Sequence, residues 1–200
     1  MDPYLVLVFV LLLFVLVVGG LRLVRREPLS SRHAGEILAI GAVLLGLARL
    51  LGISSPVLFF VVLYLVSMRV RLLVDVGNKL AMSRRSEAAS RLYGLALRLA
   101  VNPLERLIVG VNQGAALLHE GRVAEAIAVL EGVVSSPSSL GIKLEAACRC
   151  NLGLAYLRQG QVGRGRAQLQ ETIDLLPGSI YARRAYLALQ QLEGPAPEPR

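Results

Sequence analysis

Long apolar runs dominate the first third of the chain. Residues 4–21 contain no charged side chain, and a helix of this length covers about 27 Å at ~1.5 Å per residue, close to the ~30 Å apolar core of a bilayer. Asp2 precedes the run, and three arginines follow it, Arg22, Arg25 and Arg26. A cleaved signal peptide carries its positive charge before the apolar run. The pattern therefore predicts a membrane anchor.

A second apolar stretch covers residues 37–68. It is too long for one membrane helix, and its Ser-Ser-Pro cluster at 54–56 predicts a turn, because proline disfavours helix at the residue before it. We therefore expect a hairpin of two helices, about 36–53 and 57–74, that either spans the bilayer or is re-entrant. Arg49 has two interpretations: a polar contact buried in the membrane, or a side chain that extends to the interface.

Basic residues mark one side of these segments. The loop 22–36 carries four arginines and residues 69–85 carry four arginines and a lysine, whereas the N-terminus and the turn at 54–56 carry neither. Because Lys and Arg favour the cytoplasmic side, we expect the N-terminus outside and the chain beyond residue 69 in the cytoplasm. Residues 1–74 then form the membrane region. The ratio of 20 Arg to 2 Lys is typical of a GC-rich genome and favours the bacterial inner (plasma) membrane.

Beyond residue 74 the apolar residues recur at helical spacing. Residues 151–162 (Asn-Leu-Gly-Leu-Ala-Tyr-Leu-Arg-Gln-Gly-Gln-Val) resemble the first helix and turn of a tetratricopeptide repeat. Gly165 and Thr172 stand where that family prefers alanine. The small Gly153 is expected to let the two helices approach, and Gly160 to end the first helix. The residues at the family's spacing are Leu152, Gly153, Tyr156, Gly160, Leu169 and Pro177.

A second copy of the pattern lies upstream, at residues 112–123. Its turn glycine and that of the first copy are 39 residues apart, where the family spacing is about 34. The extra length falls in the Ser/Pro-rich loop 135–139. Two copies in register predict a helical-repeat domain. The residues that align with the repeat are Gly114, Leu117, Gly121 and Ala126.

Residues 75–106 have two interpretations. They form either a degenerate repeat, with Ser86 at its turn and Asn102-Pro103 at its end, or a helical connector that continues from the membrane helix. The Leu-Gly pair of the family is absent from this segment. The sequence therefore leaves both interpretations open.

The expected fold class is all-α. About three N-terminal transmembrane helices (about 4–21, 36–53 and 57–74) precede a short tetratricopeptide-like α-solenoid of helical hairpins. Residues 107–192 hold these repeats together with a closing helix, which covers the otherwise exposed face of the last repeat. The Pro-rich tail 193–200 is predicted to be disordered.

Charge and cysteine usage narrow the functional classes. The net charge is +8, with a surplus of seven in residues 1–106 and of one in residues 107–200. The basic excess thus accompanies the membrane segments, and nucleic-acid binding is not expected. Cys148 and Cys150 would point about 200° apart on a helix, which disfavours a disulfide or a shared metal. They are predicted to be small buried residues.

No motif predicts chemistry in this chain. No nucleophile lies near a His and a carboxylate, and no phosphate-binding loop or metal-ligand spacing occurs. The acidic residues Glu120, Glu125 and Glu131 are interpreted as a solvated face. We therefore expect no enzymatic activity, no cofactor and no metal.

The resemblance implies that a partner binds the concave surface formed by the first helix of each repeat. Leu118, Leu154 and Leu157 could instead pack against helices of this same chain, and His119 and Arg158 could be ordinary solvent-facing residues. The matching positions are Val111, Ala115, Leu118 and His119 in one repeat, and Ala147, Cys150, Leu154, Leu157 and Arg158 in the next.

Two functions remain open at this stage. The first is a membrane-anchored adaptor or scaffold whose repeats hold a protein partner, such as a short peptide segment, at the cytoplasmic face. The second is an accessory subunit of a membrane transport or envelope-assembly complex, in which the transmembrane hairpin is the working part and the repeats serve for docking. In both, the partners are a protein and the lipid bilayer.

Overall fold

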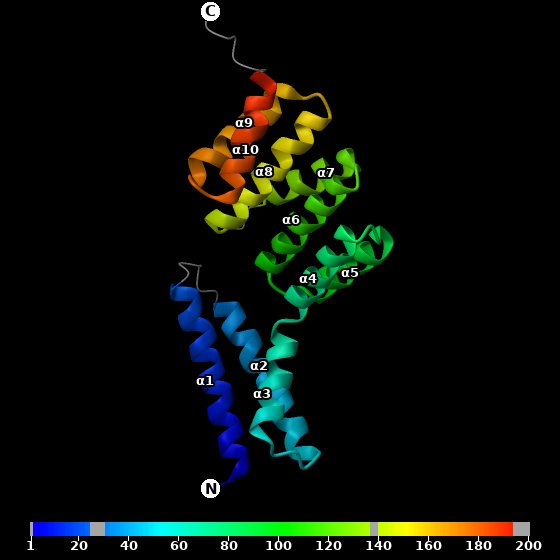
Figure 1. The fold of residues 1–200 in the computed structure, drawn as a ribbon. Helices are drawn as coiled ribbons and strands as arrows, with labels where there is room; N and C mark the ends of the chain where they lie inside the picture. Colours follow the sequence, from blue (N-terminus) through cyan, green and yellow to red (C-terminus); the bar gives the residue numbers. More distant parts are fainter. Residues whose placement is uncertain (1, 25–30, 137–139, 194–200) are drawn as a thin grey trace, which may run out of the picture. The chain divides into compact units, whose positions relative to one another are not determined.

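The computed structural model describes residues 2–24, 31–136 and 140–193. In this part of the chain every regular element is a helix, ten in all, which confirms the all-α fold class (Figure 1). The chain divides into two compact units, residues 1–72 and 73–200. The tail that was predicted to be disordered lies outside the described residues beyond residue 193.

The first unit is a bundle of three helices, α1 (Pro3–Val24), α2 (Ser31–Leu50) and α3 (Pro56–Ser67), which all pack against one another. Local capping defines where two of them begin. Asp2 Oδ1 accepts a hydrogen bond from the backbone N–H of Tyr4 at 2.9 Å, and Ser55 Oγ accepts one from that of Leu58 at 3.4 Å. The turn predicted at 54–56 accordingly lies between α2 and α3.

Apolar side chains fill the inside of this bundle and also cover its outside. The buried ones are Leu7, Leu11, Phe14, Ile37, Ala48, Phe59 and Leu63. Exposed ones occur on all three helices, among them Leu5, Phe9, Leu12, Leu16, Val43, Leu47, Val57, Leu58, Tyr64 and Leu65. No charged residue occurs in 3–21, 37–48 or 50–68, so the ionisable side chains of the bundle sequence lie toward the ends of the apolar segments.

Helix length and hydropathy give a mixed result for membrane spanning. Within the described residues no helix on its own has the length and apolar character to cross a bilayer. One bent pair, α3 followed by α4 (Arg69–Met82), meets that test when the two helices are taken together, on length and composition alone. The helix expected at about 57–74 is therefore divided at Met68, which carries the C-cap of α3.

The second unit consists of three helical hairpins and a closing helix (Figure 1). After α4 follow α5 (Ser86–Leu99), α6 (Pro103–His119), α7 (Val123–Val134), α8 (Ile142–Arg158), α9 (Val162–Leu175) and α10 (Ile180–Glu193). The hairpins are α4–α5, α6–α7 and α8–α9. The predicted closing helix is α10, which packs on α8 and α9. Ser179 Oγ accepts a hydrogen bond from the backbone N–H of Ala182 at 3.0 Å and so caps its start.

The three hairpins turn in the same way. In each, one residue has a left-handed backbone, with φ of 59° at Arg84 and 81° at both Gly121 and Gly160. The next backbone N–H then bonds a carbonyl five residues back, as Arg85 does to Leu80 at 3.0 Å. The corresponding bonds of the other two turns measure 2.9 Å each. The expectation that Ser86 takes the turn position is wrong, because the helix-ending hydrogen bonds close at Arg84 and Arg85.

A close contact inside each hairpin also repeats. Seven residues before the turn residue stands a glycine, and nine residues after it a large side chain packs onto that glycine. A Cβ atom at Gly153 would lie 2.7 Å from Leu169, and one at Gly77 would lie 3.0 Å from Tyr93. The α6–α7 hairpin has the same pair, Gly114 and Leu130. The unit is thus a helical repeat, and the geometry of α4–α5 favours the interpretation of residues 75–106 as a repeat.

Candidate partner-binding surface

The predicted groove residues lie on α6 and α8, the first helices of their hairpins. Half-buried positions on this surface are Ala115, Leu154 and Leu157, and His119 and Arg158 are exposed. Val111, Ala147, Leu118 and Cys150 are buried by the chain itself. Of the predicted groove residues, a partner could therefore contact only the half-buried and exposed ones, which are Ala115, His119, Leu154, Leu157 and Arg158.

Three of these five also hold the array together, and Leu154 does so by packing against its hydrophobic core. Leu157 packs against α9, since a Cβ atom at Gly165 would lie 2.4 Å from its Cδ2. The guanidinium of Arg158 donates a hydrogen bond to the backbone carbonyl of Leu118 at 2.5 Å. That carbonyl lies near the C-terminal end of α6, where the helix dipole favours a cation. Leu154, Leu157 and Arg158 thus have structural contacts within the chain, and Ala115 and His119 remain the freest positions.

The two cysteines point to opposite neighbours, as their spacing predicts. Cys148 Sγ lies 3.6 Å from the carbonyl of Leu130 on α7, and Cys150 Sγ lies 3.6 Å from that of Tyr181 on α10. Both are free thiols and both are buried, which confirms the prediction. Burial raises the pKa of the Cys148 thiol to about 12 and also raises that of Cys150. Because the thiolate is the reactive form, neither is poised as a nucleophile.

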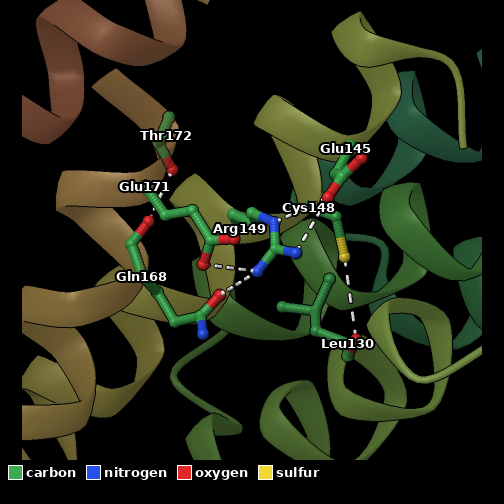
Figure 2. A network of polar contacts seen from close by, with 7 residues as sticks. All are labelled: Leu130, Glu145, Cys148, Arg149, Gln168, Glu171 and Thr172. Atoms are coloured by element: carbon green, nitrogen blue, oxygen red, sulfur yellow. Dashed lines mark hydrogen bonds and ion pairs between the residues drawn. The ribbon is translucent and has the colours of Figure 1, made fainter. Parts of the chain in front are cut away.

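A polar clamp around Arg149 connects the two helices of the last hairpin (Figure 2). From α8, its guanidinium donates to Glu145 at 2.9 Å on the same helix. It reaches α9 through Glu171 at 2.8 Å and Gln168 at 3.2 Å. Thr172, at a position where alanine is the family's preference, is fully buried and donates its hydroxyl to the carbonyl of Gln168 at 2.8 Å. This cluster serves the structure of the hairpin, since Arg149 and Thr172 bond to partners within the chain.

A second cluster connects three helices through Glu131. This carboxylate accepts hydrogen bonds from the Tyr156 hydroxyl and from Arg164, the latter at 2.8 Å. The Arg164 guanidinium also lies over the Tyr156 ring, 4.3 Å from its centroid. Burial, and then the hydrogen bond to Glu131, raises the pKa of Tyr156 to about 12. Glu131 still has 42% of its side chain exposed and Glu125 has 57%, so the solvated-face interpretation fits these two residues, whereas only 12% of the Glu120 side chain is exposed.

Sequence reasoning missed a polar connection between the first and second hairpins. The Tyr93 hydroxyl donates to Asn78 Oδ1 at 2.7 Å, and Asn78 Nδ2 donates to Asn112 Oδ1 at 2.9 Å. Burial, together with the nearby Glu120, raises the pKa of Tyr93 to about 12. The position of Asn78 within its repeat could have indicated this connection. Asn78 stands six residues before the turn residue of its hairpin, as Ala115 does in the next repeat. Asn78 therefore belongs to the same surface.

The site offers contacts and no evident chemistry. Among the described residues, no group of three or more His, Cys, Asp or Glu side chains is arranged to hold a metal ion. The surface combines half-buried apolar positions with the exposed His119, which suits recognition of a polypeptide segment. Comparison of the chain with protein-family models, with curated proteins and with solved structures gives no match.

Proposed function

We propose that this chain is a membrane-anchored adaptor. The bundle α1–α3 holds it in the bilayer with the N-terminus outside, and the repeats, of the tetratricopeptide type, bind a protein segment at the cytoplasmic face. The location that fits this function is the bacterial inner membrane.

The observation that carries the proposal is the apolar exterior of the bundle. A soluble helix keeps its apolar residues on one face, whereas large apolar side chains are both buried and exposed on α1, α2 and α3. Exposed apolar surface of this extent is typical of contact with lipid or protein. Lipid is favoured over a protein partner because the charged residues lie at the ends of the apolar segments, where they would meet the membrane surface.

The positions of the charged side chains, at the two ends of the bundle, are consistent with burial of the middle of the bundle in lipid. Arg49, in the last turn of α2, is exposed and lies over the ring of Tyr4 at 5.0 Å from its centroid. This contact with a tyrosine near the start of α1 supports the interpretation of Arg49 as an interfacial residue. At the start of α2, Glu36 forms an ion pair with Arg69, at the start of α4.

Site-specific photocrosslinking in cells tests the adaptor. A crosslinker is placed at His119 on the proposed groove and, as a matched control, at Gln170, which is exposed on α9. The adaptor predicts one protein adduct from position 119, none from 170, and loss of that adduct when the half-buried groove residue Ala115 is replaced by Glu. Equal adducts from 119 and 170 would contradict it.

One observation favours a second candidate, in which the bundle itself is the working part. The Glu36–Arg69 pair lies at a charged end of the bundle, yet only 13% and 20% of its side chains are exposed, and ionisable side chains that pair with one another in membrane segments often mark a functional site. A crosslinker at Leu47, exposed on α2, separates the two candidates. An adduct from position 47 without one from position 119 supports the second candidate and contradicts the adaptor.

A further inference from the structure

Positive charge is concentrated in one of the three hairpins. Residues 69–99, which form α4 and α5, carry seven Arg or Lys against two Asp or Glu. The α6–α7 hairpin (103–134) carries two against four, and the α8–α9 hairpin (142–175) carries five against three. The hairpin that directly follows the bundle is therefore the strongly basic one.

Its cations are exposed and largely without ionic partners. Lys79, Arg84, Arg85 and Arg98 are exposed, and within the described part of the chain none of them has a carboxylate within 4 Å. In the later hairpins, by contrast, Arg122, Arg149 and Arg164 each bind at least one carboxylate. The basic charge of α4–α5 is thus available to an external anion.

Two of the cations border one shallow recess beside the α4–α5 turn. Lys79 and Arg85 line it together with Val76, Leu80 and Ser83. Val76, which lines the recess, is 51% exposed, and Met82, which stands three residues after Lys79 on α4 and is therefore its neighbour on the helix surface, is 78% exposed. The surface therefore presents cations and apolar groups next to one another, which is the combination that a lipid headgroup region accepts.

We infer that this surface, Val76, Lys79, Met82 and Arg85, binds anionic phospholipid at the cytoplasmic face of the bilayer. Lys79 and Arg85 pair with headgroup phosphate, and Met82 and Val76 enter the boundary between headgroups and acyl chains. The inference rests on the proposed membrane anchoring of α1–α3.

Chain connectivity brings the surface within reach of the membrane. A single residue, Met68, separates the end of α3 from the start of α4, and the 14 residues of α4 extend about 21 Å. With α3 in the bilayer, α4 begins at the membrane surface, so tilting of α4 toward the bilayer brings the cations of the turn within the ~10 Å over which anionic lipids attract basic residues. Met82 and Val76 make anionic lipid a better ligand for this surface than free phosphate or an acidic protein. A lipid bilayer has an apolar layer directly beneath its charged headgroups, and the two apolar side chains can enter that layer.

Tryptophan fluorescence of the full chain tests the inference. The chain contains no tryptophan, so Met82→Trp introduces a single reporter. It is reconstituted into nanodiscs of phosphatidylcholine, with or without phosphatidylglycerol. We expect a blue-shifted emission, quenched by brominated acyl chains, only where phosphatidylglycerol is present, and a weaker shift at high salt.

Charge variants sharpen this test. Lys79→Gln/Arg85→Gln is expected to lower the ratio of docked to undocked hairpin by about fivefold per residue, the effect of one basic side chain at an anionic surface. Arg183→Gln/Arg184→Gln on α10, which removes the same charge from exposed positions elsewhere, is expected to leave the ratio unchanged. Equal losses in the two variants would overturn the inference and indicate a general charge effect.

The remaining outcomes separate this inference from the proposed function. A chain that fails to co-purify with any nanodisc overturns the anchoring and this inference with it. A chain that is anchored, but whose emission is the same with and without phosphatidylglycerol, overturns this inference alone and leaves the cations to an acidic protein surface. A shift produced in detergent by inorganic phosphate alone also overturns it, since the ligand would then be a free anion.

Discussion

The first and last hairpins of the array share a backbone and differ in what surrounds it. Both α4–α5 and α8–α9 turn through a left-handed residue and pack a large side chain onto a glycine. In α8–α9 the two helices approach so closely that Gly153 and Gly165 face each other's backbone. In α4–α5 the glycine instead meets the flat ring of Tyr93. The repeat thus needs few fixed positions, and the rest of each hairpin is free to carry ion pairs or open charge.

The largest expected effect comes from closing the tight approach in α8–α9. A Cβ at Gly153 would lie 2.7 Å from Leu169 Cγ and 3.1 Å from the carbonyl of Gly165. Overpacking costs about 1–3 kcal/mol, and the upper end applies here because the backbone carbonyl of Gly165 cannot move aside as a side chain can; this loss exceeds the ~1 kcal/mol that alanine gains over glycine in a helix. We expect Gly153→Ala to increase hydrogen exchange of the α8 and α9 amides in the full chain.

Two other glycines serve as controls for that prediction. A Cβ at Gly163, in α9, would meet nothing within 4 Å, so Gly163→Ala should stabilise the hairpin by up to ~1 kcal/mol through helix propensity and slow its amide exchange accordingly. Gly77→Ala in the first hairpin should fall between the two, because a Cβ there would lie 3.0 Å from Tyr93. If Gly77→Ala were as harmful as Gly153→Ala, the two hairpins would not differ in tightness.

The next effect concerns Tyr156, whose place in the first hairpin is taken by Leu80. Tyr156→Phe removes the hydrogen bond to Glu131, and because 42% of the Glu131 side chain is exposed and can regain water, the loss is about 0.5–1.5 kcal/mol. We expect faster exchange of the α7 and α8 amides. Tyr186→Phe on the exposed side of α10 is the control and should change little. A change no larger than that of the control would show that the Glu131 bond adds no stability.

The same tyrosine gives the α7–α8 contact a pH dependence. Its pKa is raised from 10.0 to about 12 in the folded chain, so the neutral hydroxyl is the form that the fold stabilises. The stabilisation is fully present below about pH 10 and is lost as the pH rises through about 12. Tyrosinate absorbance in an alkaline titration should lose a late component in Tyr156→Phe. If the absorbance that Tyr156→Phe removes belonged instead to a tyrosine titrating near pH 10, the raised pKa of Tyr156 would be contradicted.

The sequence predicted the parts of the array that depend on local rules. Gly160 ends a helix with a left-handed backbone and Gly153 permits close packing, and both follow from the physics of glycine. The first hairpin was harder to recognise because an arginine takes the turn. The spacing of Gly77 and Tyr93 around that turn carried the signal, since it equals that of Gly153 and Leu169.

Contacts between distant residues were beyond the sequence pattern. Arg158 bonds a carbonyl 40 residues away, and Tyr156 reaches Glu131 across 25 residues. Periodicity shows which face of a helix is apolar, but it does not show which polar side chain meets which neighbour after packing. The candidate surface lies on α6 and α8, and the burial of Val111 and Ala147 within it emerged only from the structure.

Exchanging the turn residues tests how far the two hairpins are equivalent. Arg84 has φ of 59° and Gly160 has φ of 81°, a region that costs a residue with a Cβ atom about 1–2 kcal/mol. Part of the gain from Arg84→Gly is offset by the greater freedom of glycine in the unfolded chain. We expect Arg84→Gly to stabilise α4–α5 by about 0.5–1 kcal/mol and Gly160→Arg to destabilise α8–α9 by about 1 kcal/mol. Thermal unfolding monitored by amide exchange of each hairpin measures both, and changes of the same sign would contradict the equivalence.

The smallest expected effect comes from comparing one ion pair in each hairpin. Arg91 and Glu87 on α5 lie 3.6 Å apart with 82% and 92% of their side chains exposed, so Glu87→Gln should cost less than about 0.3 kcal/mol. Glu171→Gln removes the 2.8 Å partner of Arg149, which is itself mostly buried, and should cost about 0.5–1 kcal/mol. Exchange of the α5 and α9 amides at low and high salt measures the two losses. The Glu171 effect should persist at high salt because Arg149 is shielded from solvent, and an effect that salt abolishes would mean that α8–α9 is held by its packing alone.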